Sequence, residues 1–385
     1  MDVVDGVKRF GGTYRSWSIL AELQSLSGGS ELVVGDETPR SLDKIASLVD
    51  NRIRDLFECE IVKWGALDDS FVRPLRDLMN FALAGGKRLR PAFCYWAFVG
   101  TGGDDPDLNV LDAAAALELL HCFALIHDDV MDGSPFRRGS ASVHARYESF
   151  HQGSELHGDS KRFGDGVAIL IGDLAFVYAD RLLEAAPLKA RQVFSELRLE
   201  VNFGQYLDVV GTARRSFDVS YATKVAIYKS GKYTVERPLH LGAALAGANE
   251  SAYAHLSLYG VPLGEAFQLR DDVLGIFGES EKTGKPVGDD LREGKPTLLY
   301  ALARDRASVR ERGLLDELFG RENLDAKEIE ILQEIFVKTG SLASVESRIE
   351  ELTELAIAEI HLGKFNAHAT TELERLAEFV GHRRS

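Results

Sequence analysis

The sequence predicts an all-α fold, a bundle of long helices around a central cavity. Three observations support this fold class. From Ser41 onward, long segments rich in Leu, Ala, Glu and Arg carry apolar residues at helical spacing. Clean alternation of apolar and polar residues, which is typical of a half-buried strand, does not occur in the sequence. Two acidic clusters each follow an apolar or amphipathic stretch of helical character, so both can face one cavity.

The chain divides into a short extension and one helical domain. Residues 1–40 have little apolar periodicity and several glycines, which predicts a poorly ordered N-terminal extension. Residues 41–385 are assigned to one catalytic domain. Its clearest predicted helices, in chain order, span 111–126, 190–210, 225–246 and 329–360. Glycine-rich joints are predicted at 101–106 and 153–166, and the irregular spacing of the histidines near the second joint favours a loop over a metal cluster.

Composition limits the class of protein and its partners. The formal net charge of −15 argues against nucleic acid as a partner and against direct binding to an anionic membrane surface. The best candidate for a spanning helix, 167–179, is interrupted by Gly172 and Asp173, so no stable membrane insertion is expected. The first residues lack a basic-then-apolar signal pattern, and the three cysteines form no CxxC pair. A cytoplasmic protein with free thiols is expected.

The most informative feature is a pair of acidic clusters, DDVMD at 128–132 and DDVLG at 271–275. In a helix, Asp128 and Asp132 share one face and lie about 6 Å apart along the axis. Carboxylates this close raise each other's pKa unless a cation lies between them. Oxygen-only ligands indicate magnesium, which usually binds through one or two carboxylates plus substrate phosphates. The two clusters, facing each other, can hold a diphosphate through magnesium.

Taken singly, each acidic cluster is more simply a solvated helix face, and each basic turn is an ordinary charged loop. The stretches before the clusters, 121–127 and 264–270, argue otherwise because they are apolar enough to be buried. Glycine-containing basic turns can offer backbone N–H groups and cationic side chains to phosphate. Four such turns are interleaved with the acidic clusters, at 85–91, 136–139, 229–232 and 284–288. The combination predicts a site for diphosphates.

These motifs resemble those of the trans-polyprenyl diphosphate synthase family, of the farnesyl and geranylgeranyl type, and are most similar to the bacterial geranylgeranyl enzymes. The matching segments, in the family's order and spacing, are GGKRLRP (85–91), DDVMD (128–132), RRG (137–139), GQYLD (204–208), KSG (229–231), FQLRDD (267–272) and EKTGKPVGDDLREGKPTLL (281–299). The resemblance implies the helical isoprenoid synthase fold, usually as a homodimer. It also implies magnesium-dependent condensation of isopentenyl diphosphate with an allylic diphosphate.

The resemblance assigns roles to individual residues. Magnesium, about three ions per site, is assigned to Asp128, Asp129, Asp132, Asp271 and Asp272. The catalytic set comprises Asp128, Asp132, Asp271, Lys229, Lys285 and Arg137. Isopentenyl diphosphate is assigned to Gly86, Lys87, Arg90, His121 and Arg138. The other substrate contacts are Ser230, Gln205, Gln268 and Lys295, with Arg137, Lys229 and Lys285 again. Gln205, Asp208 and Gln268 are equally well explained as buried polar residues paired between helices.

Product length is expected to depend on the helix before the first acidic cluster, because the growing tail runs beside it. The positions five and four residues before Asp128 are Phe123 and Ala124. One aromatic and one small residue resemble the geranylgeranyl pattern, which implies a twenty-carbon product. Deeper residues such as Leu119 and Leu120 can override this floor, so farnesyl diphosphate or another length stays open.

Two other classes of protein stay open as alternatives. A class I terpene cyclase shares the helical fold and the first acidic motif, but it has no need of a GGKRLRP site and has a different second metal motif. A non-catalytic partner subunit is suggested by Gly275, which stands where the family usually has aspartate. The intact basic residues argue against this second alternative.

Overall fold

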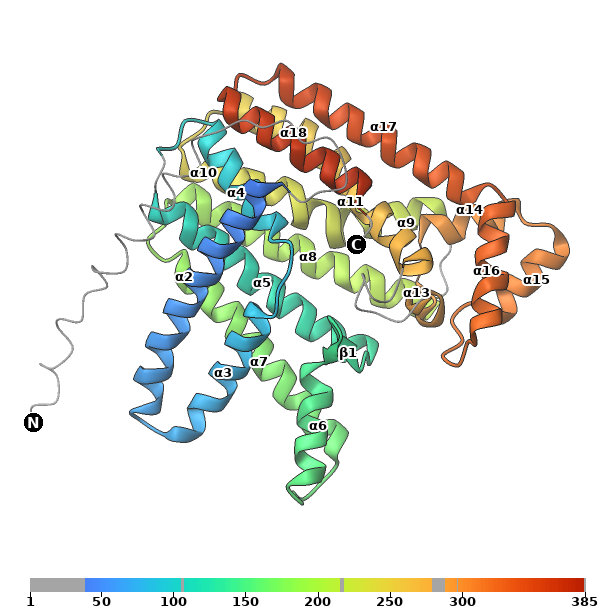
Figure 1. The fold of residues 1–385 in the computed structure, drawn as a ribbon, viewed down its shortest axis with the longest axis horizontal. Coiled ribbons are helices and arrows are strands. Elements are labelled where there is room, and N and C mark those ends of the chain that lie inside the picture. The colour runs from blue at the N-terminus through green and yellow to red at the C-terminus, as the bar shows by residue number, and fades with distance from the viewer. Residues whose placement is uncertain (1–38, 105–106, 215–217, 279–287, 296, 384–385) are drawn as a thin grey trace, which may run out of the picture.

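The computed structural model describes residues 39–104, 107–214, 218–278, 288–295 and 297–383, and helices make up nearly all of them (Figure 1). The predicted all-α fold is therefore confirmed. Of the N-terminal extension predicted at 1–40, residues 1–38 lie outside the described residues. The first half contains α2 (Arg40–Gly65), η2 (Asp69–Phe71), α3 (Val72–Leu83), α4 (Leu89–Gly100), α5 (Leu108–Asp132), β1 (Phe136–Arg137), β2 (Ser140–Ala141), α6 (Val143–Gly153) and α7 (Ser160–Leu182). The second half contains α8 (Leu188–Arg214), α9 (Val219–Val225), η3 (Ala226–Glu236), α10 (Arg237–Leu245), α11 (Glu250–Phe277), α13 (Asp289–Glu293), α14 (Leu298–Arg306), α15 (Val309–Leu318), α16 (Ala326–Lys338), α17 (Ser341–Leu362) and α18 (Ala367–His382).

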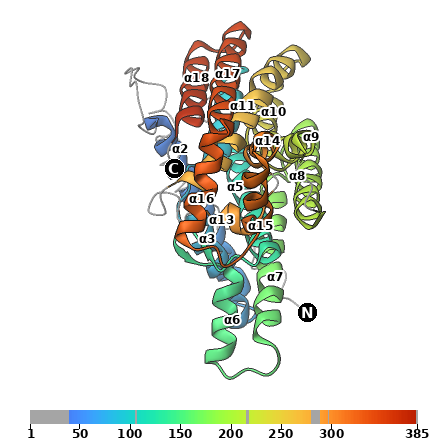
Figure 2. The ribbon, with the colours of Figure 1, turned by 90° about the vertical axis from the view of Figure 1, so that its right-hand side faces the viewer.

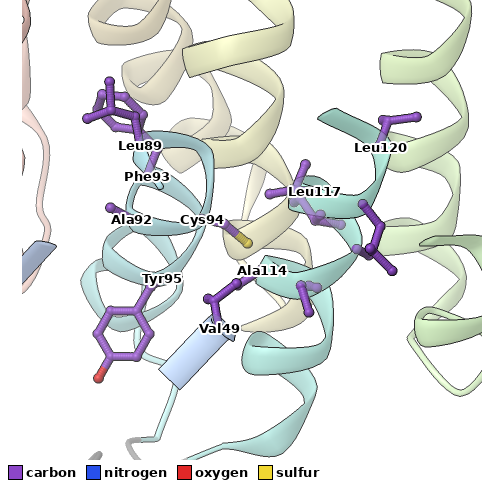
Figure 3. Packing of buried hydrophobic residues seen from close by; sticks show 14 of the residues in the cluster. Val49, Leu89, Ala92, Phe93, Cys94, Tyr95, Ala114, Leu117 and Leu120 are labelled. Carbon is purple, nitrogen blue, oxygen red and sulfur yellow. The ribbon is translucent and has the colours of Figure 1, made fainter. Parts of the chain in front are cut away.

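Helix α5 runs through the centre of the bundle and carries the first acidic cluster at its C-terminal end. The Asp107 side chain caps its N-terminus by accepting the N–H of Asn109, and Gly133 ends it in the left-handed conformation (φ 66°). Between these caps, a run of buried alanines and leucines lets α4 and α7 pack closely against it. Figure 3 shows Ala114, Leu117 and Leu120 in this core, beside residues of α2 and α4. The aspartates therefore follow directly on a rigid, buried segment.

Helix α11 joins two hydrophobic cores. Its first half contributes Leu256, Tyr259 and Leu263 to the large core built by α2, α4, α5, α7 and α8. Its second half contributes Val273 and Ile276 to a smaller core made with α13 to α17. In Figures 1 and 2, α14, α15 and α16 gather at one end of the molecule, while α6 and the start of α7 project from the bundle. The second acidic cluster thus lies where the two cores meet.

Several predicted boundaries change. The segment expected as one helix at 329–360 is two helices, α16 and α17, because Gly340 adopts a left-handed backbone (φ 70°) between them. The joint expected at 153–166 ends earlier, because Asp159 caps α7 at Ser160. The hairpin of β1 and β2 was not expected from the sequence, and it places Arg137 beside the first acidic cluster.

In the part of the chain that the structure describes, the candidate for a membrane span is α5 rather than the predicted segment 167–179. Among the described residues, α5 is the one helix long and apolar enough to cross a membrane by length and composition. Of its most apolar window, 67% is buried inside the protein, and a core helix meets the same criterion. Its apolar character is therefore explained by packing inside the bundle.

Candidate active site

A cavity of about 520 Å³ opens between α4, α5, α8, η3 and α11, with β1 and the residues around α13 at its rim. Most of the predicted site residues line it, although they come from distant parts of the chain. They are Lys87, Arg90, His121, Ala124, Asp128, Arg137, Gln205, Lys229, Ser230, Gln268, Asp271, Asp272 and Lys295. Gly86, Phe123, Asp129, Asp132 and Arg138 are not part of its lining, and Lys285 lies outside the described residues.

Side chains from three other elements meet at Asp128 of α5. Its Oδ1 accepts hydrogen bonds from Gln205 of α8 at 2.9 Å and from Lys229 of η3 at 3.2 Å, and its Oδ2 lies 3.4 Å from Arg137. Burial alone would raise the pKa of Asp128, but Lys229, Lys295 and Arg137 together hold it well below its usual range. The carboxylate is therefore charged and already surrounded by cations.

Asp129, the neighbour of Asp128, faces the protein interior. Its side chain is 1% exposed and forms an ion pair with Arg137, whose Nε donates to Oδ1 at 2.7 Å. Arg137 is thereby held over the end of α5, where it reaches both aspartates. In this geometry Asp129 orients Arg137, and the magnesium-binding role that the resemblance implies for it stays a prediction.

Lys295 connects the second half of the chain to the first acidic cluster. Its Nζ lies 3.3 Å from Asp132 and 2.5 Å from Glu293. Burial raises the pKa of Asp132 to about 6; Lys295 opposes this shift, while Asp128 and Glu293 add to it. The mutual repulsion of the two helical aspartates, expected from their spacing, is therefore present and only partly neutralised.

The two aspartates of the second cluster differ in environment. Asp271 faces the cavity with 41% of its side chain exposed, and its Oδ1 accepts a 2.6 Å hydrogen bond from Arg383 at the end of the chain. Asp272 is buried, accepts a 2.6 Å hydrogen bond from Gln268, and has its pKa raised chiefly by burial. Asp271 is therefore the more accessible carboxylate of the two, although Asp272 also lines the cavity.

Lys229 is positioned by an unusual helical segment. Segment η3 has π-helical geometry, which frequently occurs at functional sites. Its Gly231 packs against Gly264 of α11 so closely that a Cβ at Gly264 would lie 2.6 Å from the Gly231 Cα. Lys229 Nζ lies between Asp128 and Asp208, donating to Asp208 at 2.6 Å. Asp208 therefore directs this lysine toward the acidic cluster.

A buried arginine shapes the basic loop before α4. Arg88 has a left-handed backbone (φ 51°), and its 1%-exposed side chain pairs with Asp50 at 2.7 Å and with Glu118 at 2.5 Å. Gly86 has φ 136°, and a Cβ there would lie 3.0 Å from the Arg88 guanidinium and 3.1 Å from that of Arg138. Arg88 thus anchors the loop, which explains one of its three basic residues structurally.

The other two basic residues of this loop are left available to a ligand. Lys87 Nζ and Arg90 Nε are buried yet have no hydrogen-bond partner among the residues that the structure describes. The Arg90 guanidinium lies 4.3 Å from the Tyr233 ring centroid and donates to Thr234 at 2.9 Å. His121 Nδ1 lies 3.1 Å from the Tyr233 hydroxyl, and burial among arginines lowers its pKa, so the ring is neutral. Buried cationic N–H groups that lack a hydrogen-bond acceptor call for an anion.

Three residues of the site were missed by the sequence interpretation: Arg383, Tyr233 and Asp290. Arg383 belongs to the basic run at 382–384, which is a sequence signal for an anion-binding residue. Tyr233 lies four residues after Lys229 on one helical face. Asp290 lies in the matching segment 281–299, but nothing in the local pattern indicates which carboxylate there reaches the cavity.

The donor set fits magnesium completed by a ligand. Among the described residues, no three His, Cys, Asp or Glu side chains converge closely enough to hold a metal ion alone. Asp128 and Asp271 instead supply single hard oxygens from two sides of the cavity. This suits an ion that takes one or two carboxylates and fills its other positions with phosphate oxygens and water.

Comparison with known proteins agrees with this geometry. Residues 72–336 match the family model described as polyprenyl synthetase. A geranylfarnesyl diphosphate synthase from Aeropyrum pernix is 32% identical over 287 residues, which are 72% of this chain and 84% of that protein. A nonaprenyl diphosphate synthase from Mycobacterium tuberculosis is 31% identical over 326 residues, 82% of this chain and 87% of that protein.

A similar solved structure is a geranylgeranyl pyrophosphate synthase from Corynebacterium glutamicum, complexed with isoprenyl diphosphate and magnesium. Its TM-score is 0.85 at 36% identity, and the match covers 89% of this chain and 99% of that one. The helical bundle, the paired acidic clusters and the basic loop are thus found together in a chain whose relatives are prenyl diphosphate synthases. The chain belongs to the polyprenyl synthetase family, and it is a trans-prenyltransferase.

Proposed function

We propose that this prenyltransferase condenses isopentenyl diphosphate with allylic diphosphates in a magnesium-dependent reaction, and that its product is geranylgeranyl diphosphate. The observation that carries the proposal is that two separate groups of charged side chains line one cavity, and we assign each group to one anion. One is the pair of acidic clusters, which takes a diphosphate through metal ions. The other is the basic loop, where Lys87 Nζ and Arg90 Nε are buried without a hydrogen-bond partner among the described residues. Two diphosphate substrates need two such sites.

The side chains around Asp128 favour ionisation of the allylic diphosphate. As the carbon–oxygen bond breaks, negative charge grows on the departing diphosphate, where Lys229, Arg137 and Lys295 already lie. Magnesium, when bound by Asp128, Asp132 and Asp271, supplies Lewis-acid stabilisation of the same charge. Because the three cations are held in place by carboxylates, little reorganisation is needed during the reaction.

The second substrate is held at the basic loop by Lys87 and Arg90, with Arg138 at its edge. Its double bond then attacks the allylic cation, and a proton is lost to give a new allylic product. The neutral His121 is tied to Tyr233 and lies beside this region. No side-chain nucleophile takes part, and the released diphosphate is the base we assign to the proton loss.

The affinity for isopentenyl diphosphate is expected to fall as the pH rises above about 8. Burial and, secondarily, Arg383 lower the pKa of Lys87 to about 8, although Asp271 opposes the shift. Below that pH the ammonium is present and attracts diphosphate; above it the amine is neutral. Lys87→Arg should flatten this dependence, because a guanidinium stays charged. KM for isopentenyl diphosphate, measured across the pH range for both proteins, tests this, and identical pH profiles would contradict it.

Product length is proposed to depend on α5. Ala124 borders the cavity, whereas the ring of Phe123 packs behind it, 4.6 Å from the His127 ring and 4.9 Å from the Phe176 ring. One small residue at the cavity and one aromatic residue behind it support a twenty-carbon product. The relatives' names include both geranylfarnesyl and nonaprenyl diphosphate synthases, so the family alone does not specify a length.

Ala124→Phe is expected to shorten the main product towards farnesyl diphosphate, because a ring at this position fills the path of the tail. Phe123→Ala should lengthen the product, by a smaller amount, since it removes a ring behind the wall. Chromatographic sizing of the products after removal of the diphosphate tests both changes. If neither variant changes the product distribution, α5 does not set the length.

A homodimer in the cytoplasm is the proposed state of the protein. On α8, Leu199, Phe203 and Tyr206 form an exposed apolar stripe at spacings of four and three residues, and on α7 Leu170 and Val177 are also exposed. Such stripes are typical of surfaces that pair with another subunit. Light scattering on the purified protein measures the molar mass directly.

The decisive experiment combines the purified chain with magnesium, radiolabelled isopentenyl diphosphate and each allylic primer in turn. Geranylgeranyl diphosphate as the main product is the expected result. A linear product of another length would correct the length and leave the reaction intact. Cyclised hydrocarbons would favour a terpene cyclase, and silence with every primer would favour a non-catalytic partner subunit.

A further inference from the structure

Gly275 leaves a space on α11 that a carboxylate from another element fills. Gly275 lies four residues after Asp271, on the same helical face. A Cβ built at Gly275 would lie 2.6 Å from the Asp290 Cγ and closer still to its Oδ2. Both Gly275 and Asp290 line the cavity. The Asp290 carboxylate therefore occupies the place where a side chain at position 275 would begin.

The position of Asp290 is determined by the packing of α13. Glycines with left-handed backbones bound this short helix, Gly288 (φ 74°) before it and Gly294 (φ 69°) after it. Leu291 is fully buried in the smaller core, and its carbonyl accepts a 2.8 Å hydrogen bond from the Gly320 N–H. Because its neighbour is anchored in this way, the Asp290 carboxylate is directed at α11.

We propose that Asp290 supplies the carboxylate that the second acidic cluster lacks at position 275, and that it completes the magnesium site of Asp271. This inference rests on the proposed magnesium-dependent function. It assigns Gly275 a role as well: the missing side chain makes room for Asp290. The second acidic cluster then has its third carboxylate in the folded protein, although its own sequence segment, 271–275, does not contain it.

A purely structural role for Asp290, as a partner of Lys295, makes a different prediction. Lys295 contacts Asp132 and Glu293, and burial would lower its pKa, but these carboxylates and above all Asp290 raise it. Neutralising Lys295 would not require the Asp290 carboxylate to lie against Gly275. If the role concerns magnesium, a carboxylate returned at position 275 should replace the one removed from position 290.

The test measures magnesium binding, separately from activity. Mg²⁺ is titrated calorimetrically into the full-length protein with inorganic diphosphate present, and thermal melting confirms folding. Asp290→Ala should weaken Mg²⁺ binding about tenfold or more, in the range seen when carboxylates around a metal are removed.

Adding Gly275→Asp to this variant should restore most of the affinity. Adding Gly275→Ala, which fills the same space without charge, should not. In the wild-type background Gly275→Asp should give no gain, because its Cβ displaces Asp290.

Unchanged Mg²⁺ affinity in Asp290→Ala would overturn the proposal, as would equal rescue by Gly275→Ala and Gly275→Asp. If Asp290→Ala does not fold, the isosteric Asp290→Asn tests the loss of Mg²⁺ affinity alone, because its amide fills the space that an aspartate at position 275 would need. A wild-type protein that shows no Mg²⁺-dependent diphosphate binding would instead refute the proposed function on which the inference rests. The two failures are therefore distinguishable.

Discussion

Asp128→Ala is expected to reduce turnover by several powers of ten, each tenfold costing about 1.4 kcal/mol of transition-state stabilisation. Asp128 is a proposed magnesium ligand, and Lys229, Arg137 and Gln205 converge on it. Removing its carboxylate removes metal ligation and also releases the cations that it positions. Both losses act on the departing diphosphate, so they are expected mainly in kcat. Steady-state assays with a saturating allylic primer measure the effect.

The fold should tolerate this change, because each cation around Asp128 keeps another carboxylate. Lys229 keeps Asp208, Arg137 keeps Asp129, and Lys295 keeps Asp132 and Glu293. Some stability is still lost at neutral pH. The folded-state pKa of Asp128 is depressed, so its contribution is present above the unfolded pKa and disappears as the pH falls through the folded one. Asp128→Asn is the matched control, because it removes the negative charge and keeps the shape of the side chain. Near-wild-type activity in EDTA would refute the metal role.

Asp271→Ala is expected to lower the rate at least about a hundredfold, roughly 2.7 kcal/mol of barrier. Asp271 is the exposed carboxylate of the second cluster on the cavity, and its ion pair with Arg383 can be exchanged for one with a metal ion. Asp272 is buried and bonded to Gln268, so Asp272→Asn should have a smaller effect on the rate. Equal losses in the two variants would contradict this ranking.

The assay of Asp271→Ala needs a control for Arg383, which loses its partner in that variant. Arg383→Ala leaves Asp271 in place and removes the competing cation. If the loss in Asp271→Ala arises from the metal, raising the Mg²⁺ concentration should recover part of its activity, and Arg383→Ala should need no additional Mg²⁺. If the loss arises from a released Arg383, the double variant should regain most of the activity.

The local pattern of the sequence determined the helices and the placement of their side chains. The run of alanines and leucines before Asp128 specifies a buried helix, and the four-residue spacing to Asp132 places both on one face. Basic turns such as the one containing Lys87 and Arg90 could be identified because glycine and cationic residues are adjacent in the chain. The family motifs added the roles of residues whose partners are far away. Two predictions at this level were wrong. A helix was expected across Gly340, where the backbone turns left-handed, and the joint expected at 153–166 is helical from Ser160 onward.

Only the tertiary structure decided which charged side chains meet. Asp129 and Asp128 are neighbours in sequence, yet one turns inward to Arg137 while the other faces the cavity. Arg383 reaches Asp271 across more than a hundred residues of chain, and Asp290 fills the space left at Gly275. Helical periodicity depends on residues three and four positions apart, so it is present in the sequence. Contacts between helices depend on how whole faces pack, and burial of the two cores, rather than any local pattern, sets those contacts.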